Sequence, residues 1–341
     1  MVNKMKFKFI FFSLLFFLIS LPSNAADYGY NAIKQRQRIT CGVDADYNYL
    51  ANKVEGQWRG FDVDICRAFA QALLQDSESF RIVPVKRDKV GSSLNSGKID
   101  VMLGHNIFSP AEEALQGITS LDIMYYDRLA FAARQNKANA SSMKEYAYSK
   151  VCAQDNSAAY EAAMQYSTKY ALGFNFIKFA TPAAVKEAFY LRRCELVAGD
   201  EVFLKSIVKD LRSDEAAVLP EEMGVVAVKS YVAMANNGIG AAFSSVVSAL
   251  KNASALGMNI NNFEVFKSDS STLVRNILGI NPKMWKKLRI SADWLEKYMQ
   301  NYGSYTDILE RNFGKNSALD IDITHNLPYN QGGLIVISPI L

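Results

Sequence analysis

Short apolar runs alternate with amphipathic stretches along most of the chain, a pattern that predicts layered α/β structure. A helix is predicted after the first apolar run, with Asp62 as its cap and Ile65, Phe69 and Leu73 on one face. With the apolar runs on either side, it forms a βαβ unit containing a parallel strand pair. The strands predicted in this half of the chain are 38–43, 80–85, 99–103 and 129–133.

A second block begins near residue 140 and repeats this order of elements. Thr181 and Pro182 are typical of an N-cap and of the first position of a helix. Two similar blocks, joined at 129–134 and 223–229, predict two lobes with a hinge and a cleft between them. Strands are predicted at 150–153, 174–179, 195–198, 216–219 and 225–228, followed by helices at 240–256, 284–301 and 304–313.

The N-terminus resembles a secretory leader. Lys4, Lys6 and Lys8 are followed by an almost wholly apolar run to Leu21, and a small-residue cleavage pattern ends at Ala25. The run is about 15 residues long, short of the ~20 that span a bilayer. We therefore predict a signal peptide at 1–25 and export to the periplasm. No cysteine stands at the cleavage site to carry a lipid anchor.

Export to an oxidising compartment favours disulfide bonds between the four cysteines, Cys41, Cys66, Cys152 and Cys194. Four cysteines allow three pairings. Nearest-neighbour pairing, Cys41 with Cys66 and Cys152 with Cys194, links one βα unit in each half and is the pairing we predict. Buried free thiols are the alternative, and a catalytic cysteine is not expected, because neither histidine has a sequence context that suggests a partner.

Composition narrows the function classes. With 50% hydrophobic and 21% charged residues in 341, the chain has the makeup of a folded protein of about two domains. Loss of the leader lowers the net charge from +4 to +1, which disfavours nucleic-acid binding. Two histidines and four cysteines leave little material for a His- or Cys-rich metal centre, and nucleotide-binding and hydrolase motifs are absent. We predict no metal, no cofactor and no enzymatic activity.

One stretch carries a family signature. Residues 56–68, Gly-Gln-Trp-Arg-Gly-Phe-Asp-Val-Asp-Ile-Cys-Arg-Ala, resemble the G-x-W-x-G-F-D-V-D-x-C-R-A motif of periplasmic general L-amino-acid-binding proteins of ABC transporters. Further matches lie at 96–101, 125–127, 301–303, 310–312 and 332–334. The resemblance extends over nearly all of the chain that follows the leader.

The resemblance implies an α/β, two-lobed periplasmic-binding-protein fold of type II, with a hinge and a helical C-terminal extension. Lobe 1 is expected to comprise 26–134 and 223–341, and lobe 2 to comprise 135–222. It also implies a small-molecule ligand between the lobes, and an inner-membrane permease and ATPase as partners. All four cysteines lie at family cysteine positions, which supports the pairing given above. We expect a monomer.

The ligand site departs from the family pattern. In the family, an arginine after the third strand holds the ligand α-carboxylate, a task that suits a planar guanidinium. Gapless alignment from residues 100–101 places Glu112 at that position, which reverses the charge. The family's second-lobe Ser-Gly-Thr-Thr-Thr loop is 155–159 here, with Ser157 in place but two hydroxyls lost. The aspartate that pairs with the ligand ammonium is retained as Asp200.

These departures predict a cleft with two carboxylates and no matched arginine, which favours a positively charged ligand or excludes amino acids. The alternative is that Glu112 turns to solvent and Arg128, or another basic residue, replaces the lost arginine. Tyr47 and Phe108 are expected as apolar walls. The full set of predicted ligand-binding residues is Tyr47, His105, Asn106, Ile107, Phe108, Glu112, Ser157 and Asp200.

Two functions from different classes stay open. The first is a solute-binding protein for import of an amino acid or another amine-bearing small solute. The second is a ligand-less periplasmic interaction or regulatory protein that keeps the fold. An enzyme is not expected, because no nucleophile–base pair is apparent near the cleft. A ligand screen by thermal shift separates the first two, because a ligand at 100 times its Kd adds about 2.7 kcal/mol of stability.

Overall fold

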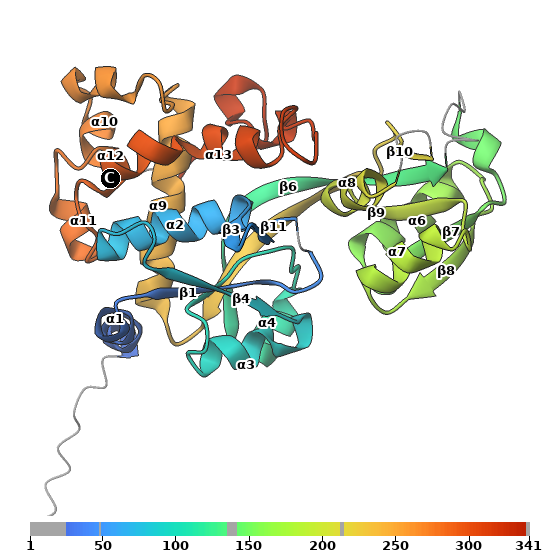
Figure 1. Cartoon of the computed structure of the whole chain (residues 1–341), viewed down its shortest axis with the longest axis horizontal. Coiled ribbons are helices and arrows are strands. Elements are labelled where there is room, and N and C mark those ends of the chain that lie inside the picture. Colours follow the sequence, from blue (N-terminus) through green and yellow to red (C-terminus); the bar gives the residue numbers. More distant parts are fainter. Residues whose placement is uncertain (1–24, 48, 135–141, 212–214, 339–341) are drawn as a thin grey trace, which may run out of the picture.

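Two lobes are joined by two long strands in the computed structural model, which describes residues 25–47, 49–134, 142–211 and 215–338 (Figure 1). One mixed sheet runs through both lobes, and this confirms the predicted two-lobed α/β fold. Across the sheet the strands are β4 (Phe80–Val85), β1 (Ile39–Asp44), β5 (Val101–Met102), β11 (Gly224–Ala233), β6 (Ile118–Arg134), β9 (Leu196–Asp200), β7 (Lys150–Gln154) and β8 (Asn175–Phe179), with β10 (Ala216–Val218) paired to β6.

Lobe 1 contains the predicted βαβ unit, in which β1 pairs in parallel with β4 and with β5. Helix α2 (Phe61–Leu74) links β1 to β4, and its apolar face is buried. Gly60 precedes it with φ 132°, and a Cβ there would lie 2.2 Å from the Leu50 carbonyl oxygen, so only glycine fits. The prediction that Asp62 caps this helix is wrong: Gly60 is the N-cap, and Asp62 lies buried in the first turn.

Several short elements complete lobe 1. Helix α1 (Ala25–Arg36) was not predicted. Its Tyr30 hydroxyl donates to the carbonyls of Gly238 and Leu288, which fastens the helix to the C-terminal part of the chain. The other elements are β2 (Asn52–Val54), β3 (Gln57–Arg59), η1 (Arg87–Lys89), α3 (Val90–Asn95) and α4 (Pro110–Gln116).

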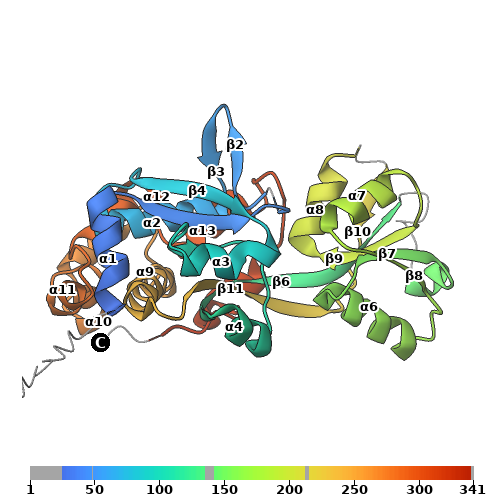
Figure 2. The same ribbon diagram turned by 90° about the horizontal axis from the view of Figure 1, so that it is seen from below.

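Lobe 2 is a three-layered unit around β7, β8 and β9, which are parallel to one another. Helix α6 (Ala158–Lys169) covers one face of the sheet, and α7 (Pro182–Tyr190) with α8 (Glu201–Lys209) covers the other (Figure 2). Thr181 caps α7 by accepting a hydrogen bond from the Ala184 N–H, and Pro182 takes the first position, as predicted. The segment also contains η2 (Met143–Tyr146).

Strands β6 and β11 form the hinge. They pair antiparallel from Gly224 opposite Leu129 to Ala233 opposite Ile118, with register irregularities near Lys229. The sequence predicted only residues 129–133 as a strand, but β6 has 17 residues and begins at Ile118. Two adjacent crossing strands leave the lobes connected through a narrow section of sheet (Figure 1).

The C-terminal part packs on lobe 1 around α9 (Asn237–Ala255). The predicted single helix at 284–301 is wrong, because the chain turns at Arg289, where φ is 58°. This turn brings the buried rings of Trp285 and Trp294 to 5.8 Å between centroids. The elements are η3 (Phe263–Ser268), α10 (Thr272–Ile277), α11 (Lys283–Lys287), α12 (Trp294–Tyr302), α13 (Tyr305–Asn312), η4 (Thr324–Asn326) and η5 (Tyr329–Gln331).

Both predicted disulfides are present. Cys41 of β1 is bonded to Cys66 of α2, with 6.2 Å between Cα atoms. Cys152 of β7 is bonded to Cys194, with 5.8 Å between Cα atoms. Each bond closes a loop of moderate length, so each is expected to contribute about 2–4 kcal/mol to stability.

The predicted signal peptide, 1–25, lies outside the described residues except for Ala25. Within the described part of the chain, every helix is too short or too polar to cross a membrane.

Candidate functional site

A cavity of about 540 Å³ lies between the lobes, at the carboxyl ends of β1, β5, β7 and β9. Ligands of open α/β sheets bind at such strand ends. All eight residues that the sequence predicted as ligand contacts line it; that they bind a ligand stays a prediction. These residues are Tyr47, His105, Asn106, Ile107, Phe108, Glu112, Ser157 and Asp200.

A buried polar cluster of Tyr47, His105, Asp127 and Asp200 is called the floor below; Tyr47, His105 and Asp200 line the cavity, whereas Asp127 does not. The Tyr47 hydroxyl donates to Asp200 Oδ2 at 2.8 Å, and the Tyr47 ring stacks on His105 with centroids 4.5 Å apart. His105 Nε2 lies 3.4 Å from Asp127 Oδ2 and 3.7 Å from Asp200 Oδ2. The cluster therefore joins side chains of lobe 1, the hinge and lobe 2 in one contact network.

The N-terminus of α8 holds both carboxylates of this cluster. Asp200 is the N-cap of α8, and its Oδ1 accepts from the Phe203 N–H at 3.0 Å. Asp127 Oδ1 accepts from the N–H groups of Glu201 and Val202. Helix N-termini stabilise negative charge, so each carboxylate is fixed by one oxygen and turns the other toward His105.

Burial and neighbouring charge shift the ionisation of the cluster. Burial alone would lower the pKa of His105, but Asp200 and Asp127 outweigh it and raise that pKa to about 9. Burial, followed by the charge of Asp200, raises the pKa of Asp127. Burial also raises the pKa of Asp44 to about 6. Because its pKa is raised above 7, the protonated form of His105 is favoured at neutral pH.

Glu112 occupies a different corner and is 43% exposed. It forms a capping box with Ser109 at the start of α4, and its Oε1 accepts from Arg87 Nη2 at 2.7 Å. Hydrogen bonding from the Ser109 N–H is the largest cause that lowers the pKa of Glu112. Arg87 also lies over the Phe108 ring at 4.2 Å and lines the cavity. An arginine from another position than the family arginine therefore lines the cavity, in keeping with the alternative that another basic residue replaces it.

Sequence analysis did not single out Arg87, because it belongs to the charged run 86–89, and such runs are typical of solvated turns. Arg128, the suggested replacement for the family arginine, does not line this cavity and pairs instead with Glu201 at 2.8 Å. Asp127 was quoted only as part of a motif. Its role was not visible because α8, which supplies its hydrogen bonds, lies more than 70 residues further along the chain.

Other predicted contacts are already used by the fold. The Ser157 hydroxyl donates to the Gln154 carbonyl and accepts from the Tyr160 N–H, which caps α6. Phe108 is buried against Tyr231 with ring centroids 5.1 Å apart. Asn106 is buried, and within the described residues its Nδ2 has no hydrogen-bond partner. Asn106 is thus a predicted polar contact with an unused donor.

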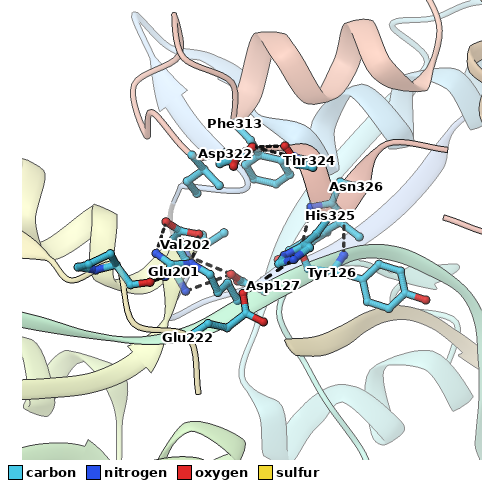
Figure 3. A pocket seen from close by; sticks show the side chains of 14 residues that line it. Tyr126, Asp127, Glu201, Val202, Glu222, Phe313, Asp322, Thr324, His325 and Asn326 are labelled. Carbon is cyan, nitrogen blue, oxygen red and sulfur yellow. Dashed lines mark hydrogen bonds and ion pairs between the residues drawn. The ribbon is translucent and has the colours of Figure 1, made fainter. Parts of the chain in front are cut away.

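A second cavity of about 400 Å³ lies along the hinge, beside the C-terminal segment (Figure 3). Asn326 holds hinge strand β6 there: its Oδ1 accepts from the Tyr126 N–H, and its Nδ2 donates to the Tyr126 carbonyl. His325 Nε2 lies 3.8 Å from Glu222 Oε2. The C-terminal segment therefore contacts the hinge directly, in addition to packing on lobe 1.

Comparison with known proteins places this geometry in a family. Residues 39–315 match the bacterial extracellular solute-binding proteins, family 3. The chain is 26% identical over 312 residues to the general L-amino acid-binding periplasmic protein AapJ of Rhizobium johnstonii, covering 90% of this chain and 91% of the relative. It is 25% identical over 316 residues to the putative amino-acid ABC transporter-binding protein YhdW of Escherichia coli K12, covering 91% of this chain and 92% of the relative.

A solved structure agrees over the same extent. The periplasmic binding protein of an ABC transporter from Brucella ovis, with glutathione bound, superposes with a TM-score of 0.81 at 25% identity. The match covers 92% of this chain and 99% of that chain, so it includes the C-terminal helical part. With the family match spanning most of the sequence, the chain belongs to the bacterial extracellular solute-binding proteins, family 3.

Proposed function

We propose that this protein is the periplasmic substrate-binding protein of an amino-acid ABC transporter. Its ligand is an amino acid or a related amine-bearing small solute, bound in the cavity between lobe 1 (26–134 and 223–341) and lobe 2 (135–222). The named relatives support the transport role. The glutathione in the Brucella structure adds a γ-glutamyl peptide to the candidate solutes.

The observation that carries the proposal is the carboxylate of Asp200, fixed at the lobe boundary inside the cavity. Asp44 and Glu112 also line the cavity and add acceptors around it. An ammonium group has three donors and no acceptor, so it matches a cavity with several carboxylates. Buried ammonium–carboxylate hydrogen bonds are among the stronger ones in proteins.

A solute carboxylate has two partners in the cavity wall, one in each lobe. The first is the N-terminus of α6, where residues 156–159 line the wall and early helix N–H groups point outward. The second is the Arg87 guanidinium, which can bind a solute carboxylate when its hydrogen bond to Glu112 is broken. Because the Arg87–Glu112 pair is exposed on both sides, exchanging one carboxylate for another costs little. We propose that Arg87 performs the task of the family arginine.

The test is a thermal-shift panel on the mature protein with glutamate, glutamine, arginine, putrescine and glutathione. We expect at least one solute to raise the melting temperature in a saturable, concentration-dependent way. Asp200→Asn is expected to abolish the shift. Asp210→Asn, the same change near the far end of α8, is expected to keep it.

The ligand-less alternative is favoured by one observation. Asp200 is already satisfied from within, by the Tyr47 hydroxyl, the Phe203 N–H and the nearby His105. If the folded wild-type protein gives no shift with any member of the panel, the transport proposal fails and this alternative takes its place.

A further inference from the structure

Three donor atoms converge on one point of the floor, from His105 and Asp200, which line the inter-lobe cavity, and from Asp127, which lines the cavity along the hinge. His105 Nε2, Asp127 Oδ2 and Asp200 Oδ2 all lie within 4.8 Å of one another. His105 Nε2 is 3.4 Å from the first oxygen and 3.7 Å from the second. These separations are too long for strong hydrogen bonds. Two metal–ligand bonds of the usual length at a tetrahedral angle place their donor atoms about 3.3 Å apart.

A second observation is independent of this spacing. Among the described residues, His105 Nε2 and Asp127 Oδ2 are buried and have no hydrogen-bond partner. The two side chains are only 7% and 2% exposed, and both atoms face the shared point. Buried polar atoms are nearly always satisfied, so two unsatisfied atoms facing each other indicate that a further species belongs between them.

The surroundings of the three side chains fix their orientation. The second oxygen of each aspartate is bonded to N–H groups of α8, and the His105 ring is stacked on Tyr47. Outer contacts of this kind hold first-shell ligands in known metal sites. Carboxylate donors alone suit Mg²⁺ or Ca²⁺, whereas an added imidazole shifts the preference to first-row transition metals.

We propose that His105, Asp127 and Asp200 bind one divalent transition-metal ion, such as Zn²⁺, at the floor. Its two charges balance the two carboxylates. The three ligands come from the loop after β5, from hinge strand β6 and from the end of β9, so the ion ties lobe 1, the hinge and lobe 2 together. A bound ion and a solute ammonium would compete for Asp200, so metal binding and solute binding are tested separately.

In the test, the mature protein is treated with EDTA to remove metal and then freed of EDTA. It is titrated with ZnCl₂ by calorimetry, with MnCl₂ and MgCl₂ in parallel runs. We expect one Zn²⁺ per chain, with Mg²⁺ much weaker. His105→Asn is expected to weaken Zn²⁺ binding by at least about tenfold. The chain has only two histidines, so His325→Asn is the matched control and is expected to leave the affinity unchanged.

A measurement on the unmodified protein covers the case in which a variant does not fold. The histidine ring proton signals of His105 are expected to move on Zn²⁺ addition, while those of His325 stay in place. No stoichiometric Zn²⁺ binding, or unchanged His105 signals, overturns the proposal and leaves the imidazole as an ion-pair partner of the carboxylates. Running the solute panel in EDTA keeps the two proposals separate, since failure of metal binding leaves that result intact.

Discussion

The two charged ends of the inter-lobe cavity are held in different ways. At the floor, Asp200 is buried and accepts hydrogen bonds from the Tyr47 hydroxyl and from the Phe203 N–H, at the start of its own helix. At the corner, Glu112 is 43% exposed and its partner Arg87 is 44% exposed. Because Asp200 is buried, the stability of the fold depends on its charge and its hydrogen bonds, whereas solvent screens the charge of Glu112.

This difference explains why the corner tolerates a reversed charge. Glu112 stands at the start of α4, where a carboxylate completes a capping box and suits the helix dipole. Arg87 lies beside it and compensates its charge. A similar reversal at the floor would leave a buried charge without its partner. We therefore expect ligand selectivity to change at the Glu112 corner and stability to depend on the Asp200 floor.

The largest expected effect is on stability at the floor. Asp200→Ala removes the cap of α8 and leaves the Tyr47 hydroxyl and His105 without their acceptor, which we expect to cost about 3 kcal/mol. Glu112→Ala breaks an exposed pair and a capping box, for which about 1 kcal/mol is expected. Urea denaturation of both variants measures the difference. Equal losses would remove the distinction between the two ends.

The next largest expected effect is a pH dependence of stability that arises from the buried Asp62. Burial raises the pKa of Asp62 to about 8, whereas an unfolded chain ionises near the ordinary value of 3.8. Because the folded state retains the proton, the contribution of Asp62 to stability falls as pH rises from about 4 to 8. Asp62→Asn cannot ionise, so its advantage over wild type is expected to grow with pH, by up to about 1.4 kcal/mol per pH unit and thus by less than about 3 kcal/mol between pH 5 and 7. A gap between the two unfolding free energies that stays constant with pH contradicts this.

The smallest expected effect concerns selectivity at the corner. Glu112→Gln keeps the size of the side chain and frees the Arg87 guanidinium for a solute carboxylate. We expect affinity for an anionic solute, glutamate or glutathione, to rise by about three- to tenfold, in keeping with an exposed charge pair. Affinity for putrescine, which has no carboxylate, is expected not to rise. Weaker glutamate binding by the variant would show that Glu112 itself contacts the ligand.

The comparison of the two ends also shows how far sequence reasoning extends. Local signals were sufficient for the βαβ order, for the Thr181 cap and for both disulfides. The residues around the cavity were predicted from the resemblance to the family, and in the structure they lie at strand ends that share one edge of the sheet. The hairpin of β2 and β3 was missed because each strand has three residues, too few for an apolar alternation.

Contacts between segments that are distant in the sequence could not be predicted from local signals. The first half of β6 is mostly half-buried and carries mixed polar and apolar residues, so only its buried end was predicted. Arg87 belongs to a short run of charged residues, and such runs are exposed to solvent in most proteins. Lys89 of the same run is indeed exposed. Asp127 gained its role only when the fold brought α8 to the hinge.

Calorimetric titration with the solute selected by the panel is the most direct test of the central claim, that an amine-bearing solute binds in the inter-lobe cavity at Asp200. The wild-type protein and Asp210→Asn are predicted to bind one solute per chain with similar affinity. Asp200→Asn, which folds with an acceptor oxygen still available to the α8 N–H group, is predicted to bind at least about tenfold more weakly, since a charge-assisted hydrogen bond is lost. Equal binding by Asp200→Asn and Asp210→Asn would contradict the account.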